Sequence, residues 1–507
     1  MLTLDPTSID LSTLRQLWQG APCKLDDASM NRVRASAAAV DRIVASGEIV
    51  YGINTGFGLL ANTRIPADRL AELQRNLILS HSCGLGDALP RHVVRLMIVL
   101  KLLGLGRGYS GVRRQVIDAL QSLLDQDAMP LIPAQGSVGA SGDLAPLAHL
   151  IAALLGEGRI DVAGTVLPAR EALDRLRLKP LWLGPKEGLA LINGTQASTA
   201  IALDALFMAE RVFGAAIAAG ALSVDALKGS CRPFDPRLHE VRGQPGQIRV
   251  ASLLRELLDG SEIICSHENC PRVQDPYSFR CQPQVMGASL DLLTNAARTL
   301  TIEAGAVTDN PIVFEPSEFN DSDIAISGGN FHAQPVAFAA DIIAMALCEV
   351  GSLSERRTAV LIDPKMSGLP AFLTDEGGVN SGLMIPQVTQ AALVAENRSL
   401  AFPSSVDSVP TSAGQEDHVS MAPISARKAA TIARNVAGIV GVELIAAAQG
   451  VDYHAPLKTS AKLQAIHAKV RAISPHLDRD RYWADEMAAL QTAVLAGEFG
   501  SIIHLHH

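Results

Sequence analysis

The stretch ISARKAATIARNVAGIVGVELIAAAQG, residues 424–450, decides the fold class. It consists mostly of alanine, valine, isoleucine and glycine, and as a single helix it would extend for about 40 Å. A helix this long and this apolar buries its surface against other helices. Arg434, Asn435 and Glu443 interrupt its most apolar part, which favours a buried core helix over a membrane span. The stretch therefore predicts one member of a helix bundle.

Other apolar runs of helical periodicity extend this interpretation in both directions along the chain. Long helices are predicted over 186–219, 287–307 and 335–362, and shorter ones over 28–47, 91–106, 115–127 and 144–158. A strand-like patch at 159–168 predicts a hairpin. We therefore expect a mainly all-α fold with a long central bundle and a smaller, mixed N-terminal region. The expected domains are residues 1–185 and residues 186–507, with active-site loops on the second.

Composition narrows the class of protein. Of 507 residues, 48% are hydrophobic and only 19% are charged, which predicts a large core and surface that is buried against partner subunits. The net charge of −9, without a basic block, argues against nucleic acid as a partner. The N-terminus lacks the basic and apolar regions of a signal peptide. Seven scattered cysteines fit a reduced compartment, so we expect a cytoplasmic protein without a membrane partner.

Two short motifs resemble ligand sites but lack the required context. GRGYSG at 106–111 matches a dinucleotide-binding pattern, but the run before it is helical and no βαβ unit follows. Cys265, His267 and Cys270 fit no common zinc spacing, and no fourth ligand is evident. We therefore expect neither a nucleotide nor a metal cofactor.

The stretch GSVGASGDLAPLAHL, residues 136–150, gathers small residues around one serine just before a helix. A nucleophilic serine of the hydrolase type needs G-x-S-x-G after a strand, and here the last glycine is missing. Backbone chemistry is the alternative. If the Gly142 amide nitrogen approaches the Ala140 carbonyl carbon, a five-membered ring closes, and Gly142 has no Cβ to block the approach.

Ring closure with loss of two waters would leave an electron-poor alkene. One water comes from the Ala140 carbonyl and one from the Ser141 hydroxyl, and Asp143 is placed to assist proton removal. The product is 4-methylidene-imidazole-5-one (MIO), formed from Ala140, Ser141 and Gly142.

The surrounding motifs resemble those of the MIO-dependent aromatic amino acid ammonia-lyases. The matching blocks, in the family order, are YGINTGFG (51–58), the Ala-Ser-Gly loop, LALINGTQAST (189–199), QDPYSFRCQPQVMG (274–287), TDNPIVF (308–314), SGGNFHAQPVA (327–337), GSLSERR (351–357) and SAGQEDHVSM (412–421). Together they cover nearly the whole chain. The resemblance implies an all-α homotetramer in which each active site is built from three subunits.

The resemblance also implies roles for single residues. Ser141 would become the electrophile, Tyr51 the base and Asn193 a hydrogen-bond donor to the MIO oxygen. Arg280 would hold the substrate carboxylate, with Tyr277 at the reacting centre. Gln274 would line the site, Phe331 would pack beside MIO, and Glu416 would act on the substrate. From the residues alone, Asp275 as the N-cap and Pro276 as the first helical residue predict a helix start that favours a carboxylate near Arg280.

The pair Ser80-His81 in LILSHSCG, residues 77–84, resembles the selectivity position of this family. In the family, phenylalanine lyases tend to carry Phe-Leu at this position and tyrosine lyases His-Leu. The Ser-His pair resembles the histidine-specific form, so it favours L-histidine as the substrate. The expected reaction is elimination of ammonia from L-histidine to give urocanate. A tyrosine or phenylalanine lyase, an aminomutase and a non-catalytic homologue remain alternatives, and whether the amine or the ring attacks MIO stays open.

Overall fold

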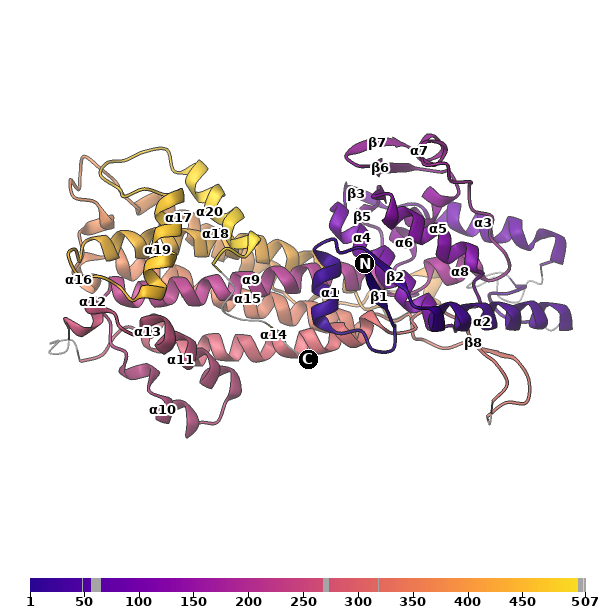
Figure 1. The fold of residues 1–507 in the computed structure, drawn as a ribbon, viewed down its shortest axis with the longest axis horizontal. Helices are drawn as coiled ribbons and strands as arrows, with labels where there is room; N and C mark the ends of the chain where they lie inside the picture. Colours follow the sequence, from indigo (N-terminus) through magenta and orange to yellow (C-terminus); the bar gives the residue numbers. More distant parts are fainter. Residues whose placement is uncertain (48, 56–64, 268–272, 318, 500–504, 506–507) are drawn as a thin grey trace.

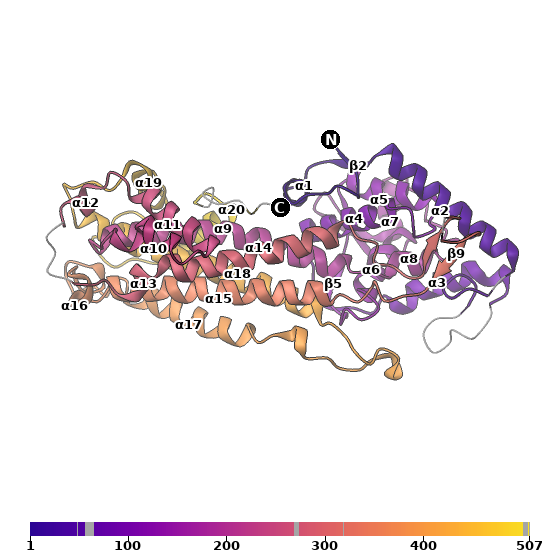
Figure 2. The same cartoon turned by 90° about the horizontal axis from the view of Figure 1, so that it is seen from below.

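The computed structural model describes residues 1–507 except 48, 56–64, 268–272, 318, 500–504 and 506–507. The molecule is elongated (Figure 1). Long helices run side by side through one part of it, and shorter helices with small sheets gather at the other end (Figures 1 and 2). The expectation of a mainly α fold with a mixed N-terminal region is confirmed.

The bundle contains the longest helices. Its elements and their bounds are α9 (Gln196–Ala226), α10 (Pro236–Glu240), α11 (Pro245–Leu258), α12 (Glu262–Cys265), α13 (Tyr277–Arg280), α14 (Gln282–Ala304), α15 (Gln334–Leu361), α16 (Pro364–Ser367), α17 (Met384–Leu400), α18 (Ala422–Asp452), α19 (Ala461–Ile473) and α20 (Ala484–Ala496). The antiparallel strand pair β8 (Ile312–Phe314) and β9 (Ile324–Ile326) follows α14 in the chain but lies at the N-terminal end, where β8 packs against α2 (Asp27–Ser46) (Figures 1 and 2). Helices α14, α15 and α18 lie within a few residues of their predicted spans.

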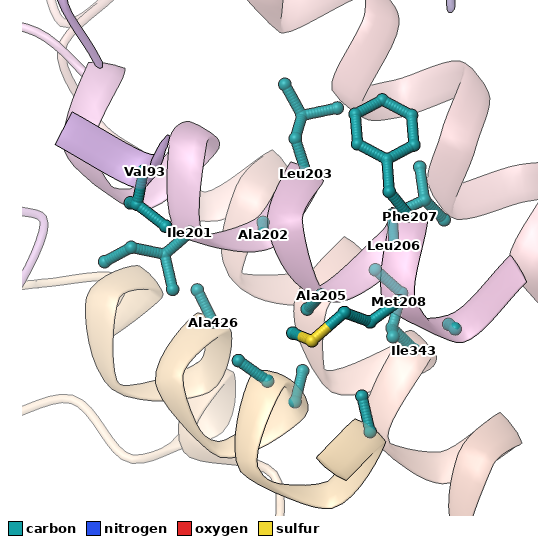
Figure 3. Packing of buried hydrophobic residues seen from close by; sticks show 14 of the residues in the cluster. Val93, Ile201, Ala202, Leu203, Ala205, Leu206, Phe207, Met208, Ile343 and Ala426 are labelled. Atoms are coloured by element: carbon teal, nitrogen blue, oxygen red, sulfur yellow. The ribbon is translucent and has the colours of Figure 1, made fainter. Parts of the chain in front are cut away.

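Helices α9, α15 and α18 form the centre of the bundle, and each packs along the other two. Figure 3 shows side chains of α9 packed with Val93 of α4, Ile343 of α15 and Ala426 of α18. The helices are long and apolar enough to cross a membrane by composition, but 94%, 67% and 78% of their most apolar windows are buried inside the protein. Most of their apolar surface is therefore buried in the core of the protein.

One ion pair lies inside this core. Arg357 of α15 pairs with Glu443 of α18, and both side chains are fully buried. The Arg357 Nη2 donates to Glu443 Oε2 at 2.7 Å, and Ser223 of α9 donates to Glu443 Oε1 at 2.8 Å. Three bundle helices thus meet at one carboxylate.

The N-terminal part combines short helices with small sheets. Its elements are β1 (Leu2–Leu4), α1 (Leu11–Trp18), β2 (Cys23–Leu25), α2 (Asp27–Ser46), α3 (Leu70–His81), β3 (Leu85–Ala88), α4 (Arg91–Gly106), α5 (Arg114–Asp125), β4 (Ala128–Pro130), β5 (Pro133–Gln135), α6 (Leu144–Leu154), β6 (Arg159–Val162), β7 (Thr165–Pro168), α7 (Ala169–Arg175) and α8 (Glu187–Ile192). The predicted hairpin is β6–β7, and it pairs antiparallel. GRGYSG begins at the last residue of α4 and continues into the loop before α5.

The prediction of one continuous helix over 186–219 is wrong. The chain leaves the helix after Ile192 and re-enters it at Gln196. Asn193 is extended, with φ −82° and ψ 140°, and Gly194 has φ +123°, which favours glycine. Helix α8 packs against α3 and α6 of the N-terminal part, whereas α9 enters the bundle. The domain boundary at 185 and 186 stays a prediction.

Candidate active site

A cavity of about 830 Å³ opens where the N-terminal part meets loops from the bundle. Its walls bring together residues that the sequence predicts for the site, namely Tyr51, His81, Ala140, Ser141, Asn193, Phe331 and Glu416. They come from separate segments of the chain, and the fold alone places them in one space. The cavity is therefore the candidate active site.

The Ala140–Gly142 loop has a backbone that requires glycine. Gly142 has φ +77°, and a Cβ there would lie 2.3 Å from the Gly194 nitrogen. The two glycines form a parallel β-bridge, and the Asp143 amide donates to the Gly194 carbonyl at 2.7 Å. Among the described residues, none accepts a hydrogen bond from the Gly142 amide. The break between α8 and α9 thus holds the loop in place.

Asn193 lies at this same break and faces the loop. Its Nδ2 donates to the Ser141 carbonyl oxygen at 2.9 Å. That oxygen is the carbonyl of the ring that cyclisation of residues 140–142 would form. The geometry can therefore stabilise negative charge on this oxygen.

Asp143 is fully buried directly behind the loop. Its Oδ2 accepts from the Ser198 amide at 2.7 Å and from the Ser198 hydroxyl at 2.8 Å, and its Oδ1 accepts from Ser137 at 3.2 Å. Burial raises the pKa of the Asp143 carboxyl, and these hydrogen bonds oppose the rise. Asp143 therefore lies next to the loop, where a carboxyl can exchange a proton.

Glu416 contacts the serine from the opposite wall. The Ser141 hydroxyl donates to Glu416 Oε1, and Thr411 donates to Oε2 at 2.6 Å. Burial alone raises the pKa of Glu416, but hydrogen bonds from Ser141, Thr411 and Ser412 contribute to a net lowering. Glu416 is therefore a carboxylate at neutral pH, and it faces the cavity.

One ring nitrogen of His81 forms a hydrogen bond with the backbone of its own helix. Its Nδ1 lies 2.8 Å from the Leu77 carbonyl oxygen, which can only accept. A neutral ring with the proton on Nδ1 carries its acceptor lone pair on Nε2. His81 can thus offer an acceptor to a ligand in the cavity.

Tyr51 reaches the cavity from a tightly packed turn. The next residue, Gly52, has φ +76°, and a Cβ there would lie 2.6 Å from Leu189 and 2.9 Å from Pro311. The backbone next to Tyr51 therefore packs closely against Leu189 and Pro311. The end of its motif, residues 56–58, lies outside the described residues.

Gln274, Tyr277 and Arg280 do not line this cavity within one chain. Helix α13, which carries Tyr277 and Arg280, lies at the end of the bundle away from α3 and α8 (Figure 2). Helix α9, with 31 residues, spans about 45 Å between these ends. Within one chain, Arg280 therefore cannot reach a substrate at Ser141.

Tyr277 instead lines a second cavity of about 440 Å³, together with Arg356 and Met366. The Arg280 guanidinium lies over the Tyr277 ring, 4.6 Å from its centre, as their spacing on one turn predicts. The prediction that Asp275 caps this helix is wrong. Its carboxylate accepts from the Ser230 amide at 2.7 Å, and Pro276 stands at the cap.

A model of the aromatic amino acid lyase family matches residues 9–472 of this sequence. The chain belongs to the aromatic amino acid lyase family. It is 57% identical over 491 residues to a histidine ammonia-lyase of Paracidovorax citrulli, and the match covers 97% of this chain and 95% of that protein.

Solved structures of aromatic amino acid lyase relatives have the same fold. Histidine ammonia-lyase from Trypanosoma cruzi has a TM-score of 0.90 at 38% identity, over 99% of this chain and 94% of that one. Tyrosine aminomutase from Streptomyces globisporus has a TM-score of 0.92 at 34% identity, over the whole of both chains. The fold is therefore common to relatives with different named reactions.

The lyase cavity also contains residues to which the sequence assigned no role. Asn310, Ser327, His332 and His418 line it. Asn310 Nδ2 donates to Ser327 at 3.0 Å, and the rings of His332 and His418 stack 5.8 Å apart. All four lie within or next to the matched blocks, so a search for polar residues inside those blocks could have found them.

The candidate metal cluster of this lyase is only partly described. Cys270 lies outside the described residues, whereas Cys265 and His267 lie within them. Among the residues that the structure describes, no group of three histidine, cysteine or acidic side chains could hold a metal ion.

Proposed function

We propose that this protein is a histidine ammonia-lyase that converts L-histidine to urocanate and ammonia. The observation that carries the proposal is the shared cavity in which Ser141 contacts Glu416, Asn193 contacts the Ser141 carbonyl and His81 faces the same space. The 57% identity to a named histidine ammonia-lyase over 97% of the chain supports this substrate.

The electrophile is MIO, formed from Ala140, Ser141 and Gly142. The residues present fit this group, because the positive φ of Gly142 and its contact with Gly194 leave no room for a Cβ. When formed, the group supplies an electrophile that binds the substrate amine and improves it as a leaving group. Asn193, which donates to the Ser141 carbonyl, would hold the oxygen of this group, and Phe331 from the cavity wall would pack beside it.

Tyr51 takes the proton from the β-carbon of the substrate. It lies in the same cavity as Ser141, on the turn that packs against Leu189 and Pro311. A base on a rigid turn holds its oxygen in one place while the carbon–nitrogen bond breaks.

His81 and Glu416 recognise the imidazole ring of the substrate. A neutral imidazole has one donor and one acceptor nitrogen, and leaving one of them buried and unpaired costs roughly 1–3 kcal/mol. The Glu416 carboxylate accepts from the ring N–H, and the His81 ring provides the second polar contact. A phenyl ring offers no donor to Glu416 Oε1, which loses the Ser141 hydroxyl when MIO forms, and this favours histidine over phenylalanine.

Gln274, Tyr277 and Arg280 act in a neighbouring copy of the chain. We infer a cytoplasmic homotetramer in which the α13 end of one subunit completes the cavity of another. The separation of α13 from Ser141 within one chain supports this arrangement. Arg280 then binds the substrate carboxylate through its planar guanidinium, Tyr277 assists at the reacting centre and Gln274 lines the site.

Product analysis with L-histidine, L-tyrosine and L-phenylalanine, offered separately at equal concentration, tests the function. We expect urocanate and ammonia in equal amounts from histidine and at most traces of product from the other two. Cinnamate-type products or β-amino acids at a comparable rate would instead make the chain a different lyase or an aminomutase. No product from any of the three, with no near-ultraviolet absorbance from MIO, would indicate a non-catalytic homologue.

A further inference from the structure

A single lysine interrupts the buried face of helix α4. Lys101 stands in the apolar run RLMIVLKLLGLG, and it is 1% exposed. Its Nζ donates to the Asn193 carbonyl at 2.9 Å and to the Ala190 carbonyl at 3.2 Å. Neither the matched motifs nor the proposed mechanism uses this residue.

Both acceptors lie at the C-terminal end of helix α8. Carbonyls at a helix end have no partner within the helix, and the helix dipole favours a positive charge there. Burial lowers the pKa of Lys101 to about 8, and the charges of Asp309 and Asp143 oppose this fall. The lysine is therefore mainly charged at neutral pH, although its side chain is buried.

Two hydrogen bonds, with Asn193 between them, connect Lys101 to the reacting loop. Lys101 binds the backbone of Asn193, and the side chain of Asn193 binds the Ser141 carbonyl. The neighbouring Gly194 accepts from the Asp143 amide and forms the bridge to Gly142. The break between α8 and α9 thus has Lys101 on one side and the loop on the other.

We propose that Lys101 is a positioning residue for the cyclisation of Ala140–Gly142, acting through the backbone of Asn193. The proposal rests on the proposed function, because it concerns the formation of the same electrophile. With Lys101 in place, the segment Asn193–Thr195 keeps the non-helical course that brings Gly194 against Gly142. Without it, two buried carbonyls lose their donor and the segment relaxes away from the loop.

The cyclisation that Lys101 supports is balanced within the chain. The Gly142 nitrogen bonds to the Ala140 carbonyl carbon, and that oxygen leaves as water with the protons of the Gly142 and Ser141 amides. The Ser141 hydroxyl then leaves as a second water with the Cα proton, giving the exocyclic double bond. Lys101 touches none of these atoms.

A second buried lysine provides the matched control. Lys186 is fully buried and belongs to the same charged cluster, but its Nζ donates to the Ser110 carbonyl at 2.8 Å and to Asp309 at 3.2 Å. In the described part of the chain, the Lys186 ammonium has no hydrogen bond to Asn193 or to the loop. Replacing Lys186 removes the same charge from the same cluster without touching the proposed chain of contacts.

The test compares the full-length variants Lys101→Met, Lys101→Gln and Lys186→Met with the parent protein. The readouts are intact mass, which counts the two lost waters, and its change during incubation after rapid purification. Circular dichroism and urea unfolding report the fold. We expect a folded Lys101→Met chain with cyclisation slowed about tenfold or more. Lys101→Gln, which keeps a donor, should fall between, and Lys186→Met should cyclise at the parent rate.

A folded Lys101→Met chain that loses both waters as fast as the parent overturns the proposal. So does a Lys186→Met chain that cyclises as slowly as Lys101→Met, because the effect would then belong to the whole cluster. If Lys101→Met does not fold, a folded Lys101→Gln chain with parental cyclisation overturns it equally. A parent protein with its full encoded mass would contradict the proposed function instead.

Discussion

Ser141 is held by two contacts that serve different purposes. Asn193 binds its carbonyl oxygen at 2.9 Å, and Glu416 accepts from its hydroxyl on the cavity side. The carbonyl contact belongs to the ring that the loop would form, whereas Glu416 is available to a ligand once that hydroxyl has left. The proposed electrophile formation and the proposed substrate recognition therefore meet at one residue, and substitutions can separate them.

Glu416→Gln separates recognition from electrophile formation. The Gln amide oxygen still accepts from Ser141, so intact mass and MIO absorbance should match the parent. The lost charge should lower histidine turnover about 100-fold or more. His81→Leu should raise the KM for histidine and leave the cofactor in place. Steady-state kinetics and absorbance check both variants, and unchanged histidine kinetics in both would refute the assigned roles.

At the scale of elements, the helix spans were predictable and one break was not. Helices α14, α15 and α18 follow from long apolar runs. Residues 186–219 are equally apolar, and a single glycine at 194 did not distinguish a break from a tolerated glycine within a helix. The break exists because Gly194 packs against Gly142, a contact between residues 52 positions apart, which is absent from the local pattern.

Site residues were predictable where they belong to a recognised block, and their grouping was predictable only in part. Tyr51, Asn193 and Glu416 reach one cavity as expected. Arg280 belongs to an equally clear block but lies at the other end of the bundle. The sequence did not predict this separation, because the order of motifs carries no information about the distance between them. Lys101 was missed because one lysine in an apolar helix resembles an ordinary exposed residue.

The buried pair between α15 and α18 gives a stability prediction. Arg357→Met leaves the Glu443 carboxylate buried with Ser223 as its remaining donor, and should lower the free energy of unfolding by about 3–5 kcal/mol. The double variant Arg357→Met/Glu443→Leu removes both charges and should recover most of the loss. Urea unfolding measures each variant, and a double variant no more stable than the single one would contradict this account.

The C-terminal end of α18 gives a pH-dependent prediction. Burial alone raises the pKa of Asp452, but hydrogen bonds with His467 and His476 and the charge of Arg471 lower it to about 2. A lowered carboxyl pKa stabilises the fold above the unfolded pKa, near 4, and this stabilisation is lost as pH falls towards 2.

Asp452→Asn should therefore have a free energy of unfolding about 2 kcal/mol below that of the parent at pH 7 and at pH 5. The difference should shrink below pH 4. Unfolding curves at pH 7, 5 and 3.5 check this, and a difference that stays constant down to pH 3.5 would show that the lost contacts do not depend on the carboxylate charge.

At the scale of the whole molecule, the two ends of the bundle carry different halves of the predicted chemistry. Ser141 and Tyr51 lie at the N-terminal end, and Tyr277 and Arg280 at the other. In a homotetramer with shared sites, inactivating substitutions at the two ends should complement each other.

Ser141→Ala and Arg280→Met chains should each be nearly inactive alone, the second because an unpaired substrate carboxylate costs about 2–5 kcal/mol. Co-expression with two different tags, followed by isolation of mixed oligomers, should restore a measurable fraction of parental histidine turnover. If the mixed oligomers are as inactive as the two single variants, then Arg280 and Ser141 act in a site of the same chain, or Arg280 does not belong to the site.

The mass of the active protein tests the central claim most directly, namely that the chain makes its electrophile from its own backbone at residues 140–142. We expect an intact mass below the encoded mass by two waters, with the loss located in a peptide that contains Ala140–Gly142. Ser141→Ala should not show this two-water loss and should lose nearly all turnover while remaining folded. A protein that converts histidine to urocanate with the full encoded mass at residues 140–142 would contradict the account.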